Sequence, residues 1–315
     1  MGRRDISDPE REPSTPTAPA SPEHRQAGVD SGVSEGPRGS GADISEKAVE
    51  RAGRTIEQPD QRTSQRRSKY EIRGQSYSLR SSELDAMADI GRLRVVDVRD
   101  LARFVYSGNE ARMRSDLENL RKQGLIEQKD IHRAHKPARR LVTLTARGVE
   151  VARRASGLRR EQHLYHGMVK PKELHHDADL YKVYRKAVEE IRRKGGKPLR
   201  VRLDFEFKES INQASAAARD LPKDMRERWL AALADEHGLS VEGGRIHLPD
   251  IQIEYQTNEG RIERENLELV SRNYREQGIR GKAAAGFRIY ARASDSGRIR
   301  RALRDTGFAG EVLAI

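Results

Sequence analysis

Apolar residues recur every three to four positions in several stretches of the chain, which is the spacing of one buried face on a helix. Residues 110–123 show this most clearly, with Met113, Leu117 and Leu120 on one side and Asn109 in front as a cap. Bordering glycines and capping side chains predict further helices over residues 82–90, 98–105, 146–155, 175–194, 225–233, 271–285 and 296–307. The glycine at position 91 predicts the end of the first of these.

Alternation of apolar and polar residues predicts strands in the remaining segments. The clearest is 198–208, in which every second residue is apolar. Residues 251–255 and 262–269 alternate on either side of a turn at residues 258–260, which predicts a hairpin. Further strands are expected over residues 92–96, 125–128, 140–145, 286–293 and 311–315.

The first 77 residues lack both periodicities. Residues 13–41 consist mainly of Pro, Ser, Gly, Thr and Ala and contain no aromatic residue. Such a composition cannot bury enough apolar surface to offset the entropy lost on folding. We therefore expect a disordered tail over residues 1–77, a helix-rich domain over residues 78–157 and an α/β domain over residues 158–315.

The charge of the chain indicates a class of partner. The 315 residues carry a net charge of +12, and residues 112–160 hold fourteen Lys or Arg against five Asp or Glu. A clustered basic excess favours a polyanion such as nucleic acid, with a solvated basic face as the alternative.

Residue types and segments that the chain lacks exclude several kinds of site. The chain has no cysteine, which excludes disulfides, cysteine-ligated zinc and a cysteine nucleophile. No apolar run reaches the roughly 18 residues of a membrane helix, and the first residues lack the apolar core of a signal peptide. We therefore expect a cytoplasmic protein without a membrane partner.

The predicted elements over residues 78–156 are helix, strand, helix, turn, helix, basic hairpin and helix. This order resembles a winged helix-turn-helix, in which the second helix of the pair lies in the major groove of double-stranded DNA. The resemblance gives that role to residues 110–123 and makes the hairpin the wing. The residues expected to contact DNA are Asn109, Arg112, Arg114 and Ser115 on the helix and Lys129, Arg133, Lys136, Arg139 and Arg140 in the wing. Protein docking is the alternative use of such a module.

Two acidic residues stand out in the predicted hairpin of the second domain. Asp250 follows Pro249 at the start of one strand, and Glu268 lies near the end of the next. Carboxylates on adjacent strands can hold one Mg²⁺ ion, as in a metal-dependent phosphodiesterase. Ordinary surface positions are the alternative for both acids, because Pro-Asp commonly opens a strand.

The core elements of the second domain are predicted as helix, strand, strand, strand, helix, strand. Over residues 174–291 this order resembles the PD-(D/E)XK nuclease-like superfamily and, more narrowly, the replication-relaxation type of proteins. Those proteins join a winged helix to a nuclease-like half and tend to be encoded on plasmids and mobile elements. The matching pieces are Pro249-Asp250, Glu268, Asn273-Tyr274, Gly278, Lys282 and Gly286-Phe287.

The resemblance implies a catalytic site made of Asp250, Glu268 and Lys282, in which the lysine orients water or stabilises charge. One position departs from the family. An active nuclease of this group would usually carry Lys two residues after Glu268, and this chain has Val270. Lys282 on the following helix could supply the amine from a shifted position. The departure bears on catalysis more than on the fold.

A histidine cluster offers a different chemistry. Four histidines lie within residues 163–176, and Asp177 and Asp179 follow them. Histidines with carboxylates can bind Zn²⁺. Lys170-Pro171 separates the histidines into two pairs, so helix capping by Asp177 or simple exposure is the plainer interpretation. His176 and Asp177 would then begin the helix that flanks the sheet.

These observations favour a double-stranded DNA-binding protein of a plasmid or mobile element, acting in regulation, replication or mobilisation on plasmid or nucleoid DNA. Its nuclease-like domain would be non-catalytic, and no cofactor is expected. The alternative is a Mg²⁺-dependent endonuclease or nickase, in which Asp250 and Glu268 hold the metal and the winged helix selects the DNA. A protein–protein scaffold is a third hypothesis. The sequence leaves open whether the protein forms a homodimer that binds two half-sites.

Overall fold

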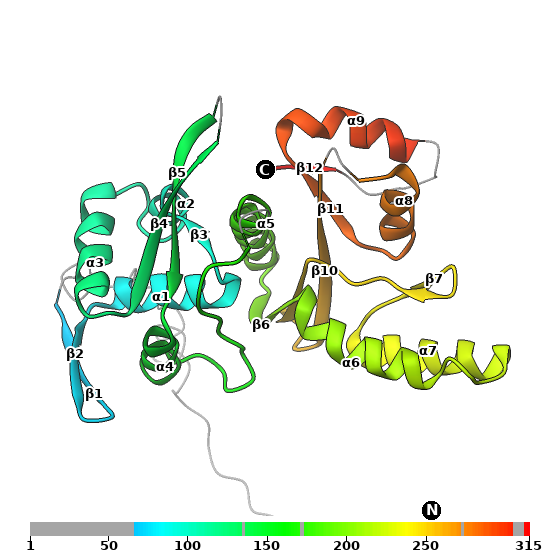
Figure 1. The fold of residues 1–315 in the computed structure, drawn as a ribbon, viewed down its shortest axis with the longest axis horizontal. Coiled ribbons are helices and arrows are strands. Elements are labelled where there is room, and N and C mark those ends of the chain that lie inside the picture. The colour runs from blue at the N-terminus through cyan, green and yellow to red at the C-terminus, as the bar shows by residue number, and fades with distance from the viewer. Residues whose placement is uncertain (1–65, 134–135, 171–172, 272–273, 305–311) are drawn as a thin grey trace, which may run out of the picture. The chain divides into compact units, whose positions relative to one another are not determined.

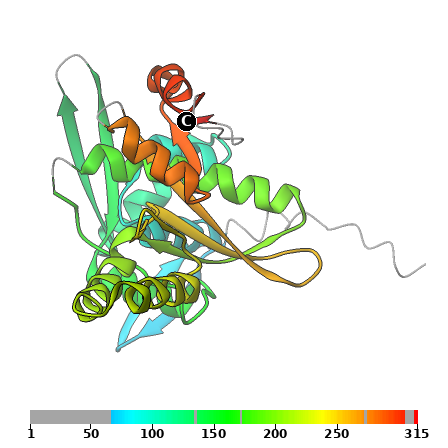
Figure 2. The same ribbon diagram turned by 90° about the vertical axis from the view of Figure 1, so that its right-hand side faces the viewer.

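The computed structural model describes residues 66–133, 136–170, 173–271, 274–304 and 312–315 (Figures 1 and 2). These residues form a mixed α+β structure, as the two periodicities of the sequence predict. None of the helices within these ranges is long and apolar enough to cross a membrane.

A β-hairpin precedes the first helix, in a segment that we expected to be disordered. β1 (Ser68–Ile72) pairs antiparallel with β2 (Gln75–Leu79). Ile72, Tyr77 and Leu79 alternate with polar residues and are buried in the main hydrophobic cluster. The predicted tail is therefore too long at its end, because this alternation is too short to stand out from the polar sequence around it.

The first half of the described structure packs helices on a three-stranded antiparallel sheet (Figure 1). Its elements are α1 (Ser81–Leu93), β3 (Val96–Asp97), α2 (Val98–Phe104), α3 (Glu110–Lys122), β4 (Ile126–Arg133), β5 (Lys136–Leu144) and α4 (Ala146–Ala155). The strands pair in the order β3-β5-β4. The side chains of Asp97, Asn109 and Thr145 cap α2, α3 and α4 as predicted, each by accepting a hydrogen bond from a backbone N–H.

The prediction that Gly91 ends α1 is wrong, since the helix continues to Leu93. Two other segments touch the helix at this glycine. A Cβ atom at Gly91 would lie 2.9 Å from Leu144 Cδ1 and 3.0 Å from Leu164 Cδ2. The missing side chain therefore permits close packing in the last turn of the helix instead of ending it.

Residues 157–170 join the two halves and pack against both. The Gln162 side chain is buried; it accepts a hydrogen bond from Val201 N (2.9 Å) and donates one to Val201 O (3.0 Å). The backbone of the same segment bonds to α1. All described residues belong to one compact unit, in which the two halves are named here only by their place in the chain.

The second half is built on a mixed sheet with the strand order β12-β11-β10-β9-β6. Its elements are α5 (Leu174–Arg193), β6 (Lys197–Leu203), α6 (Asp204–Ala217), α7 (Lys223–His237), β7 (Val241–Glu242), β8 (Arg245–Ile246), β9 (Ile251–Gln256), β10 (Ile262–Val270), α8 (Glu276–Ala284), β11 (Arg288–Ala291), α9 (Ala293–Arg304) and β12 (Leu313–Ala314). β6, β9 and β10 are antiparallel neighbours, whereas β11 runs parallel to β10 and β12 parallel to β11. The long β9–β10 hairpin is best seen in Figure 2.

α5 lies between the two halves and contacts α1, α2 and β3 on one side and β6, β9 and β10 on the other (Figure 1). Leu267 and Leu269 of β10 share a hydrophobic cluster with Tyr181 of α5. Neighbouring residues on a strand point to opposite faces, so Glu268 and Val270 face the other side of the sheet. There Val270 packs in a second cluster with residues of α8 and α9.

The strand predicted over residues 198–208 is only half right. Strand pairing ends at Leu203, and α6 begins at Asp204. At this point Glu206 Oε1 accepts a hydrogen bond from Leu203 N (2.9 Å), which caps the helix. Asp204 and Glu206 also place negative charge in the first turn, where the helix dipole favours it. Capping therefore overrides the apolar alternation.

Candidate functional site

Asp250, Glu268 and Lys282 lie together at one end of the sheet. Asp250 directly precedes β9, Glu268 lies on β10, and Lys282 extends from α8. Lys282 Nζ lies 3.0 Å from Glu268 Oε2, and Asp250 N donates a hydrogen bond to the same oxygen (3.2 Å). These three residues, with Tyr274 and His176, are called the carboxylate–lysine cluster below.

Glu268 has no exposed surface and is held entirely by protein groups. Tyr274 donates a hydrogen bond to its Oε1 (2.7 Å), and Lys282 lies at its Oε2. Burial raises the pKa of Glu268, and the charge of Asp250 raises it further. Lys282 and Tyr274 oppose this rise, and the pKa comes to about 7. The ammonium of Lys282 is therefore the main group that stabilises the ionised form of Glu268 near neutral pH.

His176 supplies a second positive group to the cluster. Its Nε2 lies 3.4 Å from Asp250 Oδ1, while Asp250 Oδ2 accepts a hydrogen bond from Leu269 N (2.8 Å). Burial disfavours the charged imidazole, but the hydrogen bond to Asp250 and its negative charge outweigh burial and raise the pKa of His176 to about 9. A charged imidazole and the Lys282 ammonium together balance the two carboxylates.

This donor set does not fit a Mg²⁺ centre. Mg²⁺ takes about six oxygen ligands at roughly 2.1 Å and keeps several waters among them. Both oxygens of Glu268 already accept hydrogen bonds, from Tyr274, Lys282 and the backbone of Asp250. The oxygens of Asp250 face His176 and a backbone N–H. A dication bound here would meet the half-buried ammonium of Lys282, so the arrangement supports an internal ion-pair network and gives no metal-dependent step.

The sequence placed three members of this cluster correctly relative to one another and missed the other two. Tyr274 was noted only as part of a matching tract, whose Asn273 lies outside the described residues. His176 was noted only in the histidine cluster and at the start of a helix, not as a partner of Asp250. Because α5 is far from β9 in the sequence, no spacing pattern links His176 to Asp250.

α3 buries one face and exposes the other. Its apolar stripe is at most 3% exposed and consists, as predicted, of Met113, Leu117 and Leu120. On the opposite side Arg114 is exposed, and its Nη2 lies 2.6 Å from Oε2 of Glu110, one turn earlier. The outer face is therefore accessible to a macromolecular partner.

The other residues predicted to contact DNA on this helix differ in accessibility. Ser115 is exposed. Asn109 Oδ1 accepts a hydrogen bond from Arg112 N (3.0 Å) as the helix cap. Arg112 is half-buried, and its Nη2 donates to Ser82 Oγ of α1 (3.2 Å). Asn109 and Arg112 thus hold the helix in place, and Arg114 and Ser115 form its outward part.

The β4–β5 hairpin protrudes from the first half, and its exposed cations differ in their partners (Figure 1). Lys129 is exposed. Arg140 is also exposed and pairs with Asp130 on the opposite strand (2.8 Å). β4 ends at Arg133 and β5 begins at Lys136, and the side chains of these two residues lie outside the described part. The hairpin is longer than predicted on both strands.

A groove of about 340 Å³ lies between the start of α3 and the hairpin. Its lining includes the cations Arg99, Arg114 and Arg140 together with His132. Glu110 and Asp130 form ion pairs with Arg114 and Arg140 and partly neutralise their charge. Guanidinium groups on both sides of a groove suit the oxygens of a phosphate group.

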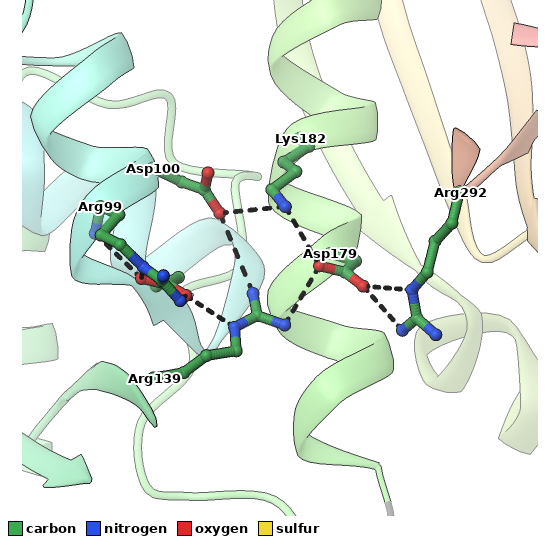
Figure 3. A network of polar contacts seen from close by, with 7 residues as sticks. Arg99, Asp100, Arg139, Asp179, Lys182 and Arg292 are labelled. Atoms are coloured by element: carbon green, nitrogen blue, oxygen red, sulfur yellow. Dashed lines mark hydrogen bonds and ion pairs between the residues drawn. The ribbon is translucent and has the colours of Figure 1, made fainter. Parts of the chain in front are cut away.

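Arg139 also lines this groove, but its guanidinium lies in a charged network between the two halves (Figure 3). We name it the junction network, and it comprises Asp97, Arg99, Asp100, Arg139, Asp179, Lys182 and Arg292. Arg139 Nε lies 2.6 Å from Asp97 Oδ2, and its Nη1 lies 3.2 Å from Asp179 Oδ1. Asp179 of α5 also binds Arg292, which follows β11 (2.7 Å). The network therefore connects β3, β5, α5 and the end of β11.

The position of Arg139 corrects its predicted role as a wing contact. Its side chain is 13% exposed and faces three carboxylates. Burial raises the pKa of Asp100 to about 6, because Lys182 and Arg139 lower it only in part. Burial would also raise the pKa of Asp179, but the charges of Arg139 and Arg292 outweigh it and lower that pKa. Arg139 thus stabilises the contact between the halves.

Replacing Arg139 by Met should lower the free energy of unfolding by about 2 kcal/mol, because Asp97 and Asp179 lose a partner in a poorly solvated place. The loss is partial, since Arg99 and Arg292 remain. The matched control is Arg140→Met on the neighbouring residue, whose exposed ion pair contributes about 0.5 kcal/mol. Urea denaturation measures both changes. Equal, small losses in the two variants would contradict the structural role of Arg139.

Two of the histidines considered as possible zinc ligands, His163 and His176, face separate carboxylates. His163 Nδ1 lies 3.7 Å from Glu206 Oε2, whereas His176 lies against Asp250. In the part of the chain that the structure describes, no group of three or more His, Asp or Glu is placed to hold a metal ion.

No model of a known protein family matches the chain, and no curated protein matches it either.

Proposed function

We propose that this protein binds double-stranded DNA through the outer face of α3 and the β4–β5 hairpin, and that its second half is a nuclease-like scaffold without catalytic activity. The observation that carries the proposal is the groove between α3 and the hairpin, with Arg114 on one side and Arg140 on the other. The surrounding stretch of sequence also holds most of the net positive charge.

The arrangement of the first half supports a winged-helix mode of binding. Helix, strand, two helices and a hairpin follow one another, with the strands in the order β3-β5-β4. α3 is the second helix of the pair, which in this type of module enters the major groove. Arg114 and Ser115 would then reach base edges, and Lys129 and Arg140 would contact phosphates.

The ion pairs of Arg114 with Glu110 and of Arg140 with Asp130 do not oppose this use. Both pairs are exposed, and an exposed pair contributes only about 0–1 kcal/mol. Each arginine can therefore exchange its carboxylate for a phosphate or a base at small cost. The interaction with DNA would be electrostatic in large part and sensitive to salt.

The order of elements in the second half supports a nuclease-like scaffold. α5, β6, β9, β10, α8 and β11 follow the expected order, and β11 runs parallel to β10. The grouping of Asp250, Glu268 and Lys282 favours an endonuclease as a second candidate. The donors that fill both carboxylates favour the scaffold instead. We further propose that the protein acts in the cytoplasm on plasmid or nucleoid DNA, in regulation, replication or mobilisation.

We expect the full-length protein to bind a fluorescent 30-base-pair duplex and to leave supercoiled plasmid intact in Mg²⁺ or Mn²⁺. The logarithm of the binding constant should fall with the logarithm of salt concentration by about 0.9 for each phosphate contacted. Fluorescence anisotropy at four salt concentrations and gel analysis of the plasmid measure the two expectations.

Two results would contradict the proposal. Absence of duplex binding even at low salt removes the DNA-binding function. Nicked or linear plasmid that is lost in Asp250→Asn, with duplex binding retained, replaces the scaffold with the endonuclease. Nicking that persists in Asp250→Asn points to a contaminating nuclease and is checked by repeating the purification.

A further inference from the structure

A second groove lies far from the DNA-binding surface in the fold, between α6, α7 and the β7–β8 hairpin. α6 and α7 lie side by side, and α7 also contacts both strands of the hairpin (Figure 2). The groove has a volume of about 430 Å³. Its apolar lining consists of Ile211, Leu230, Ile246 and Leu248, all of which are buried or half-buried. The surface can therefore take up apolar side chains.

Three arginines surround this apolar lining. Arg219 follows α6, Arg226 lies on α7 and Arg245 lies on β8, and all three are exposed. None of their side chains forms an ion pair with another residue in the described ranges, unlike Arg264 and Arg288, which pair with glutamates elsewhere in the same half. Glu227 is the only acid in the groove lining described here. The lining therefore carries three arginines against one glutamate, which leaves the rim net positive.

α7 exposes further apolar surface beside the groove. Trp229 is 47% exposed and Met225 is 51% exposed, both within one turn of Arg226. Trp229 is also the only tryptophan of the chain. Large apolar side chains next to cations are the composition found in protein interfaces, where aromatic residues, Met and Arg are enriched.

We propose that this groove docks an acidic amphipathic segment of a partner protein. Carboxylates of the segment would pair with Arg219, Arg226 and Arg245, and apolar side chains on the same face would enter between Ile211 and Leu248. Charge complementarity and the apolar lining select this occupant together. A nucleic acid would satisfy the arginines alone, since the lining residues within the described ranges include no aromatic ring to stack on a base.

The docking surface is separate from the proposed DNA-binding surface, so the two functions can be tested independently. The probe is a 16-residue helical peptide with Leu at positions spaced by three and four residues and Glu at most others. Its binding to the full-length protein is measured by the fluorescence of Trp229 and by anisotropy of a label on the peptide. We expect saturable binding, and about tenfold weaker binding to Arg226→Glu/Arg245→Glu. A peptide with Lys in place of Glu should not bind.

The matched control is Arg228→Glu, which reverses the charge of an exposed arginine on α7 outside the groove. This variant should bind the acidic peptide as the unaltered protein does. Equal loss in both variants, equal binding of the lysine peptide, or no binding at all would overturn the proposal. So would loss of duplex DNA binding in Arg226→Glu/Arg245→Glu, because the groove would then be a nucleic-acid site. Circular dichroism of each variant confirms that it is folded.

Discussion

Replacing Lys282 by Met should lower the free energy of unfolding at pH 8 by about 3–5 kcal/mol. The change leaves the Glu268 carboxylate, which has no exposed surface, with no cation in direct contact. A buried charge that loses its partner is far more costly than an exposed one. Met keeps the length and most of the volume of Lys, so lost packing contributes little. Urea denaturation monitored by circular dichroism measures the loss.

The effect of Lys282→Met should shrink as the pH falls. The pKa of Glu268 is raised from its ordinary 4.5 to about 7, so the folded state takes up the proton more readily than the unfolded state. The stabilisation that comes from this proton uptake at Glu268 is fully present below pH 4.5 and is lost as the pH rises through about 7. Without the Lys282 ammonium the pKa of Glu268 in the folded state rises further, so the stability lost at high pH becomes larger. His176 titrates in both the unaltered protein and Lys282→Met, so it contributes little to the difference in stability between them.

Glu268→Gln provides the matched control for this prediction. Gln has the same shape and carries no charge, so Lys282→Met should cost much less in the Glu268→Gln background than alone. Measurements at pH 5 and pH 8 complete the cycle. If Lys282→Met costs the same at both pH values, and the Gln background gives no relief, the ion pair is not the source of the stability.

The second large effect is expected at the proposed DNA surface. Arg114→Glu combined with Lys129→Glu should weaken duplex binding about a hundredfold at moderate salt and reduce the salt slope by about 1, the share of the phosphate contact at Lys129. Arg114 lies on the outer face of α3 and Lys129 on the hairpin, and both are exposed. The two charge reversals place one carboxylate against base edges and one against phosphates, without disturbing the buried stripe of α3. Fluorescence anisotropy at four salt concentrations measures both quantities.

Two other variants make this test specific. Arg228→Glu changes the net charge of the chain on α7 and should leave duplex binding within about twofold. Arg139→Met should alter stability more than duplex affinity at a temperature where it is fully folded, because its side chain faces Asp97 and Asp179. Equal losses of affinity in Arg228→Glu and in the double variant would mean that only net charge matters, and α3 would lose its assigned role.

Several parts of the fold could be predicted from the sequence because their causes are local. The stripe of α3 repeats within two turns, and the caps at Asp97, Asn109 and Thr145 act on residues two or three positions away. The acid pair was also found, since alternation on β9 and β10 fixes which residues meet across the turn. Residues 204–208 were assigned to a strand because their alternation outweighed a capping signal at Glu206 that is equally local.

The chain's own periodicity and capping side chains determined most helices, the β9–β10 hairpin and the proximity of Asp250 to Glu268. Only the tertiary structure decided which charges are neutralised. Arg139 meets Asp97, 42 residues away in the sequence, and Asp179 on α5, which turns an expected DNA contact into a junction residue. His176 and Tyr274 meet the two acids in the same way. A charged side chain carries no periodic sign of its partner, because its partner is set by how the elements pack and not by spacing along the chain.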